Sequence, residues 1–309
     1  MHRIVAVAVN TFREAVRDRV LYGVLGVASA VLVFTLVLAE VSLDQQRRIV
    51  LDVGLASISL FSVLVAIFLG SSLLYKEIER KTLYVILPKP IRRHEFLLGK
   101  YFGIALTAFV FVCIMGAIQL LVTAVQAGAH TATVVGVALA LPAALGLWVW
   151  KAHDRTAAVV PWSLLALGVS AMVANTADLE LLPVLSALTL NIGEVLLLTS
   201  VALFFSSFST PFLTALFTFG VWVVGRSADV MVTMKSKTIP QAIKDILAQL
   251  VGVWPNFNLF VPGRHTLETQ LTDTAGPLTY VGNNLLYAVG YSFIVLTLAA
   301  RIFQRRDFL

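Results

Sequence analysis

Long apolar stretches that lack Asp, Lys and Arg follow one another along the whole chain, separated by short polar segments. A membrane helix needs roughly 20 mostly apolar residues to cross about 30 Å of hydrocarbon. Eight stretches approach this length: 20–39, 53–74, 101–126, 131–150, 156–176, 181–205, 211–225 and 283–300. The pattern predicts an all-α, polytopic integral membrane protein with a single transmembrane domain over residues 1–309.

The number of spans stays open between six and eight. The stretches 131–150 and 156–176 are joined by a short charged turn, and removing both leaves the sidedness of every other segment unchanged. Most of the 23 Lys and Arg residues lie in segments 1–19, 75–100 and 301–309. Because Lys and Arg concentrate in cytoplasmic loops, we expect both termini to be cytoplasmic.

The first 19 residues predict an amphipathic helix. Apolar side chains recur at steps of three and four, which places them on one helical face: Val5, Val9, Phe12, Val16 and Val20. The other side carries Arg13, Glu14, Arg17 and Asp18. Such a helix either lies in the headgroup layer and meets a soluble partner, or serves only as a basic flank that fixes orientation.

The segment 75–100 is the longest expected cytoplasmic connection and holds seven basic residues. Its charged start and the apolar Leu83 and Ile86 predict a helix over 76–87. Pro88 and Pro90 end that helix because proline lacks an N–H and restricts the preceding residue. A second helix is expected to begin at Arg92. The resulting bend has an apolar centre and a charged rim, which suits a docking surface for a soluble protein; the alternative is a solvated charged loop.

On the opposite side, residues 226–282 form the longest stretch without a predicted span. Pro240 can start a helix there, and Trp254 would anchor its end at the interface before Pro255 stops it. A lid over an exit path and a simple interfacial cap are both open interpretations of this extracytoplasmic region.

The composition excludes most other classes of protein. With 59% apolar and 13% charged residues and a mean hydropathy of +0.89, the chain lies far outside the range of soluble domains. A phosphate-binding loop is absent, because the Gly99-Lys100 pair is followed by Tyr101 and has His94 in place of the first glycine. Five scattered histidines and one cysteine predict no metal site. We therefore expect no cofactor on this chain, no catalytic residue, and no nucleic-acid partner.

Glu194 is the only charge inside a predicted span, and Asn191 lies one turn before it. An ionisable residue within a membrane span indicates function by default. Two interpretations remain open: Glu194 contacts the substrate or carries a proton, or it bonds across a helix or dimer interface. Gly99-x-x-x-Gly103, at the start of the third span, is a motif for close helix packing.

Several motifs together resemble one transporter family. Glu77-x-Glu79-Arg80-Lys81-Thr82-Leu83 leads into Leu87-Pro-Lys-Pro90-Ile-Arg92-Arg93-x-Glu95-x-Leu-Leu-Gly99-Lys100. Thr11-Phe-Arg-Glu-Ala-Val-Arg-Asp-Arg19 precedes them, and Leu203-Phe-Phe-Ser-Ser-Phe-Ser-Thr-Pro211 and Pro255-Asn-Phe-Asn-Leu-Phe260 follow. The set resembles the type-2, exporter-type permeases of ABC transporters, in particular those that accompany copper-enzyme maturation and gliding-motility systems.

The resemblance implies a function and a set of partners. Residues 1–19 would be the connecting helix, residues 75–100 would hold the coupling helix, and 226–282 the extracytoplasmic hairpin. The implied partners are two copies of a separate ABC ATPase, which would carry ATP and Mg, and a second permease chain, in a homodimer surrounded by lipid. The implied location is the bacterial cytoplasmic (inner) membrane.

The resemblance also implies which residues meet the ATPase. In the coupling segment they are Glu77, Glu79, Arg80, Lys81, Thr82, Leu83, Ile86, Pro90, Arg92, Arg93 and Glu95, and on the connecting helix Phe12, Arg13 and Arg17. Lys81 departs from the family pattern, where glycine is common, and 131–176 looks like an inserted helix pair. The alternatives to a permease are a proton-coupled carrier that uses Glu194 and a membrane scaffold of a motility or assembly complex.

Overall fold

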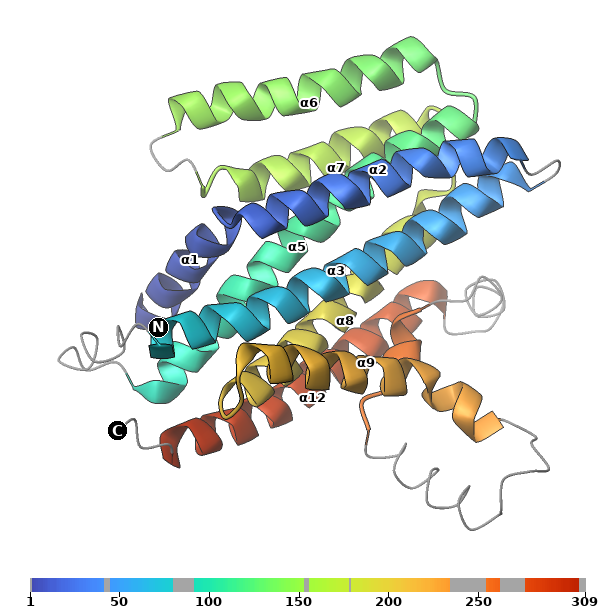
Figure 1. Ribbon diagram of the computed structural model, residues 1–309. Helices are drawn as coiled ribbons and strands as arrows, with labels where there is room; N and C mark the ends of the chain where they lie inside the picture. Colours follow the sequence, from blue (N-terminus) through green and yellow to red (C-terminus); the bar gives the residue numbers. More distant parts are fainter. Residues whose placement is uncertain are drawn as a thin grey trace.

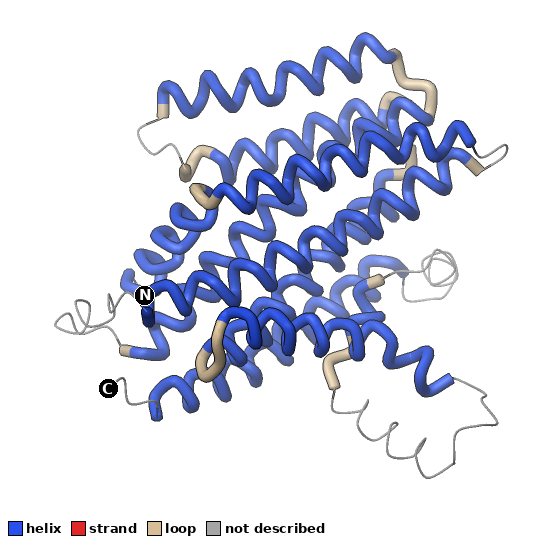
Figure 2. Tube along the Cα trace, viewed as in Figure 1, coloured by secondary structure: helices blue, strands red, loops and turns tan. Residues whose placement is uncertain are grey.

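The computed structural model describes residues 2–41, 45–79, 92–152, 156–177, 179–233, 254–261 and 276–305. Within these ranges the chain is helical and contains no strand (Figures 1 and 2). The helices are α1 (His2–Val16), α2 (Arg19–Val41), α3 (Gln46–Glu79), α5 (Arg93–Gln126), α6 (Thr131–Lys151), α7 (Val159–Asn175), α8 (Leu181–Ser206), α9 (Pro211–Thr233), the 3₁₀ helix η1 (Phe257–Phe260) and α12 (Gly276–Arg305). The expected all-α fold is confirmed.

Six of the described helices are long and apolar enough to cross a membrane: α2, α3, α5, α6, α8 and α12. α7 and the apolar part of α9, Pro211–Ser227, are shorter. Both nevertheless run along the bundle beside the longer helices (Figure 1). Both termini lie at one end of the bundle (Figure 1). The last turn of α3 and the first turn of α5, which flank segment 80–91, lie at this same end, as the predicted sidedness requires.

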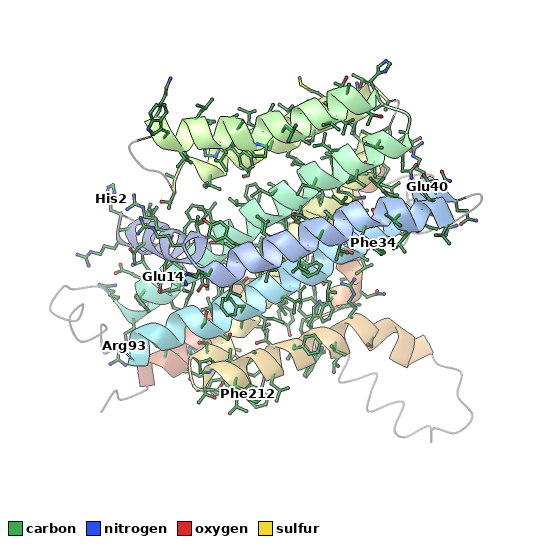
Figure 3. The ribbon with its side chains drawn as sticks, turned by 45° about the horizontal axis from the view of Figure 1, so that its top comes forward. His2, Glu14, Phe34, Glu40, Arg93 and Phe212 are labelled. Atoms are coloured by element: carbon green, nitrogen blue, oxygen red, sulfur yellow. The ribbon has the colours of Figure 1, made fainter. Side chains whose placement is uncertain are left out.

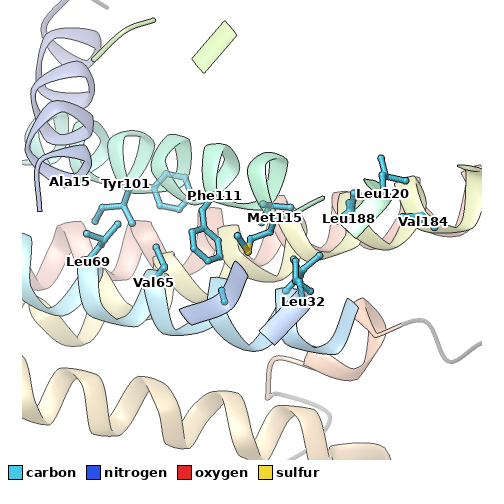
Figure 4. Close-up of a cluster of buried hydrophobic side chains, with 14 of the residues drawn as sticks. Ala15, Leu32, Val65, Leu69, Tyr101, Phe111, Met115, Leu120, Val184 and Leu188 are labelled. Carbon is cyan, nitrogen blue, oxygen red and sulfur yellow. The ribbon is translucent and has the colours of Figure 1, made fainter. Parts of the chain in front are cut away.

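α5 is the central helix of the bundle. Its most apolar window is 78% buried, against 17% for α2 and 6% for α6. Side chains of α5, including Phe111 and Met115, belong to the main apolar cluster together with Leu69 of α3 and Leu188 of α8 (Figure 4). α2 and α6 leave most of their apolar surface uncovered, so these faces are available to lipid or to another chain.

The predicted helix pair 131–176 is unequally attached. α7 packs along α5, and its Trp162 and Ala166 contact Ala117 there. α6 lies outside α7 (Figure 1) and is tied to it by a hydrogen bond from Trp162 Nε1 to the Leu141 carbonyl at 3.0 Å. Pro142 follows directly in α6. Thus α7 belongs to the packed bundle, while α6 is a peripheral helix.

Several described helices extend well beyond the predicted spans. α3 begins at Gln46 rather than near residue 53, α9 continues through Arg226 to Thr233, and α12 begins at Gly276 rather than near residue 283. The prediction ended each stretch at a charge or a polar residue, but helical backbone bonding continues past a polar side chain that has a partner or faces water. The helix predicted from Pro240 lies outside the described residues apart from Trp254, whose Nε1 donates to the Val221 carbonyl at 3.1 Å.

Candidate functional site

The N-terminal helix packs directly on the start of α5. A Cβ on Gly103 would lie 2.5 Å from Thr11 Cβ and 2.7 Å from the Ala8 carbonyl oxygen, and a Cβ on Gly99 would lie 2.5 Å from Val7 Cβ. Contacts this short leave no space for a side chain on either glycine. The Gly99-x-x-x-Gly103 motif is therefore the surface of α5 on which α1 lies.

Charged side chains support the same contact. Glu14 Oε2 of α1 lies 3.6 Å from Nζ of Lys100, whose side chain is only 1% exposed. The same ammonium group lies 5.8 Å from the centroid of the Phe96 ring. At the beginning of α1, Arg3 Nη1 lies 4.0 Å from Glu95 Oε2. His2, Glu14 and Arg93 gather at one end of the bundle, and Glu40 lies at the other (Figure 3).

The structure divides the predicted apolar face of the N-terminal helix. Phe12 and Val16 of that face are buried together with Thr11 and Ala15, whereas Val5 is 60% exposed. Val20 lies beyond the end of α1, in α2, and α1 meets Gly99 and Gly103 through Val7, Ala8 and Thr11. On the rest of α1, Arg17 is exposed and Arg13 is partly buried.

The predicted start of α5 is confirmed. Arg92 precedes the helix in an extended conformation, and its backbone N–H donates to Glu95 Oε2 at 3.1 Å. Arg93 Nη1 donates to the Phe303 carbonyl at 3.3 Å, which links α5 to the end of α12. Glu77 and Glu79 belong to the last turn of α3. The remaining predicted docking residues lie outside the described part of the chain: Arg80, Lys81, Thr82, Leu83, Ile86 and Pro90.

A polar cluster surrounds Glu194 in the middle of α8. The Glu194 side chain is fully buried. Its Oε1 accepts hydrogen bonds from Trp222 Nε1 and Arg226 Nη1, both at 2.8 Å, and its Oε2 accepts from Ser59 Oγ at 2.8 Å. One turn earlier, Asn191 Oδ1 accepts from Ser62 Oγ at 2.9 Å. The cluster thus joins α8 to α3 and to α9.

Arg226 is the main residue that sequence reasoning missed here. The hydrophobic pattern ends the span at Gly225, which places Arg226 one position beyond it, outside the membrane. In the structure α9 carries it to the level of Glu194, and its guanidinium carbon lies 5.3 Å from the centroid of the Trp222 ring. The four-residue spacing of Trp222 and Arg226, which puts both on one face of a helix, was the available signal.

The paired charge fits the interpretation of Glu194 as an interhelical contact. A charge in a membrane span is tolerated when an opposite charge and hydrogen bonds satisfy it. Both partners belong to the same chain, so the contact does not require a second copy. Among the described residues, no group of three or more His, Cys, Asp or Glu side chains could hold a metal ion.

Residues 5–308 match the family model of the ABC-2 family transporter protein. The chain belongs to this family. The match covers nearly the whole chain, which confirms the resemblance to type-2 ABC permeases, a family of membrane components without the ATPase motif. No curated protein matches the chain significantly. The family match and the six long apolar helices together make the protein a multi-pass ABC-2 permease.

The Pro255–Phe260 motif of this ABC-2 permease folds into the bundle. Phe257 and Phe260 of η1 are buried, and Gly225 and Gly193 face them, since a Cβ on Gly193 would lie 2.9 Å from the Phe260 ring. Tyr280 Oη of α12 donates to the Leu259 carbonyl at 2.9 Å. Glycines on two helices thus make room for two aromatic rings of the connection between α9 and α12.

Proposed function

We propose that this ABC-2 permease is the membrane subunit of an ATP-driven exporter, in which a separate ATPase supplies the energy. The observation that carries the proposal is the attachment of α1 to the first turns of α5. Both lie at the end of the bundle where α3 ends and α5 begins (Figure 1). An ATPase that moves this end would move α1 and α5 together, because Gly99 and Gly103 hold the two helices in contact.

The proposed complex contains two permease chains and two ATPase subunits at the bacterial inner membrane. Its ATP and Mg would be bound by the ATPase, which docks on α1 and on the segment between α3 and α5. ATP-driven closure would then shift the permease pair between inward-open and outward-open states, a two-state element biased by a ligand. The proton-coupled alternative has less support, because the Glu194 carboxylate is already paired with Arg226.

The first experiment asks whether an ATPase binds this chain. The permease carries the only tag and is co-expressed with an ATPase encoded beside its gene, and vanadate-sensitive ATP hydrolysis is measured in the eluate. We expect co-elution of the two proteins. A permease that elutes without an ATPase would contradict the proposal.

A paired substitution then tests the docking segment. Leu83→Asp with Ile86→Asp places two charges in the proposed apolar contact and should reduce the co-eluting ATPase at least tenfold. The control pair, Leu83→Met with Ile86→Val, keeps the apolar character and should retain the ATPase. Membrane insertion, measured by resistance to carbonate extraction, should be the same for both pairs of substitutions. Equal ATPase recovery from the two pairs would refute the assignment of the docking segment.

A further inference from the structure

A cavity of about 280 Å³ lies beside the Glu194 cluster, between α3, α8 and the end of η1. Its polar wall includes Ser59, Asn191 and Arg226. Arg48 and Asp52, near the start of α3, stand at its rim with side chains 51% and 55% exposed. The cavity therefore reaches from the polar cluster inside the bundle toward the end of the bundle that is opposite the termini.

The inner wall of this cavity presents hydrogen-bond donors and the positive charge of Arg226, while Arg48 and Asp52 at the rim carry opposite charges that pair with each other. Arg226 lines the cavity, whereas Glu194 does not. Within the described part of the chain, Arg226 donates hydrogen bonds only through Nη1, to Glu194 and to Ser59. The N–H groups on its Nε and Nη2 therefore remain for a ligand. Asn191 accepts from Ser62 through its Oδ1. Its amide nitrogen has no acceptor among the described residues, so its two N–H groups are also available to a ligand.

The rest of the lining is mostly apolar and includes Leu55, Leu188 and Phe260. A ligand that fits both the polar and the apolar parts of the lining has an oxygen-rich, negatively charged group and a short apolar part. At about 30 Å³ per water-sized group, the cavity has room for roughly nine heavy atoms. Guanidinium groups and amide N–H groups are the usual partners of carboxylate and phosphate oxygens.

We propose that this cavity binds a small amphiphilic oxyanion, a carboxylate or phosphate group held by Arg226 and Asn191 with its apolar part against Phe260. The Glu194 carboxylate holds Arg226 in position from behind without occupying the cavity. The anion comes from one of two sources, a soluble organic anion or the headgroup of a membrane lipid. Both would be recognised by the same donors.

The test uses the full-length permease alone, in nanodiscs of phosphatidylcholine, so its result does not depend on the ATPase proposal. Hexanoate and butyl phosphate, which match the cavity volume, are titrated and binding is followed by calorimetry and by the rise in Tm. A ligand that binds the folded state alone raises its stability. We expect saturable binding of both anions and none of hexanol or hexylammonium.

Two variants locate the site. Asn191→Leu removes the amide donor, and the Ser62 hydroxyl keeps the Ser59 carbonyl as an acceptor at 2.9 Å. Ala56→Phe fills the cavity from α3, where Ala56 is exposed. Each should weaken anion binding about tenfold or more. Ala144→Phe, on the exposed face of α6, is the control and should bind as the unchanged protein does.

Nanodiscs that contain anionic phosphatidylglycerol separate the two sources. A rise of at least fivefold in the apparent Kd of hexanoate there, absent in the Ala56→Phe variant, identifies a lipid headgroup as the occupant. An unchanged Kd identifies a soluble anion. Equal binding of hexanol or hexylammonium, no anion binding in either lipid, or full affinity in both cavity variants would overturn the proposal.

Discussion

Removal of Arg226 alone should destabilise the permease far more than removal of both members of the Glu194–Arg226 pair. The pair is 2.8 Å apart, with the Glu194 side chain 0% exposed and that of Arg226 25% exposed. Arg226→Met leaves the carboxylate buried without its cation, and Glu194→Gln leaves the cation without its carboxylate. The double variant contains neither charge.

The expected magnitudes follow from burial. Breaking a buried pair by removing one partner costs about 3–5 kcal/mol, and we expect Arg226→Met to lie in this range. Glu194→Gln should cost only about 1–2 kcal/mol. The amide oxygen still accepts a hydrogen bond from Trp222, and the Arg226 side chain keeps its access to the cavity. The double variant should cost about 2 kcal/mol. The losses of the single variants thus exceed that of the double variant by about 3 kcal/mol, which is the coupling energy.

The assay is reversible unfolding of the permease in mixed detergent micelles with increasing dodecyl sulfate, followed by circular dichroism. Arg48 and Asp52 provide the matched control, since Arg48 Nε lies 3.4 Å from Asp52 Oδ2 but both side chains are more than half exposed. Exposed pairs of this kind contribute about 0.3–0.5 kcal/mol. Additive losses at Glu194 and Arg226, or a coupling energy no larger than in the control pair, would refute the reasoning.

Two glycine substitutions test the close helix contacts. Gly103→Leu should displace α1, because a Cβ there already meets Thr11 and the Ala8 carbonyl, and should reduce ATPase co-purification at least fivefold. The control is Gly146→Leu, because Gly146 faces open space on α6. If the Gly103→Leu and Gly146→Leu variants co-purify equal amounts of ATPase, α1 has no role in docking. Gly225→Val should collide with Pro255 and Phe257 and lower the free energy of unfolding by about 1–3 kcal/mol. Gly220→Val on the same helix meets no atom within 4 Å; a loss as large as that of Gly225→Val would show that η1 packing is not the cause.

The sequence predicted the helices well because their formation depends on local properties. An apolar run of sufficient length favours a helix in a membrane whatever its neighbours are, so the main spans could be recognised one at a time. The start of α5 could also be predicted, since Pro90 prevents helix before it and Glu95 caps the first turn. The family was recognisable for a related reason, because its motifs are short and local.

Contacts between helices could not be predicted in the same way. In lipid, apolar side chains gain little by facing another helix rather than a hydrocarbon tail, so packing is decided by shape and by polar partners. The hydrophobic pattern put Val5 and Phe12 on one apolar face of α1, but it did not show that Val7, Ala8 and Thr11 meet the glycines of α5. It also gave α6 and α7 equal weight, although α7 alone packs closely on α5.

The sequence by itself determined that this chain is a helical membrane protein of the ABC-2 type, with its basic residues concentrated at one end and no ATP-binding loop. Only the tertiary structure decided that Glu194 meets Arg226 and that a cavity lies beside them. The two residues are 32 positions apart on helices that run in opposite directions. Their pairing depends on how α8 and α9 align, and that alignment is set by side-chain packing across the bundle rather than by the pattern within either helix.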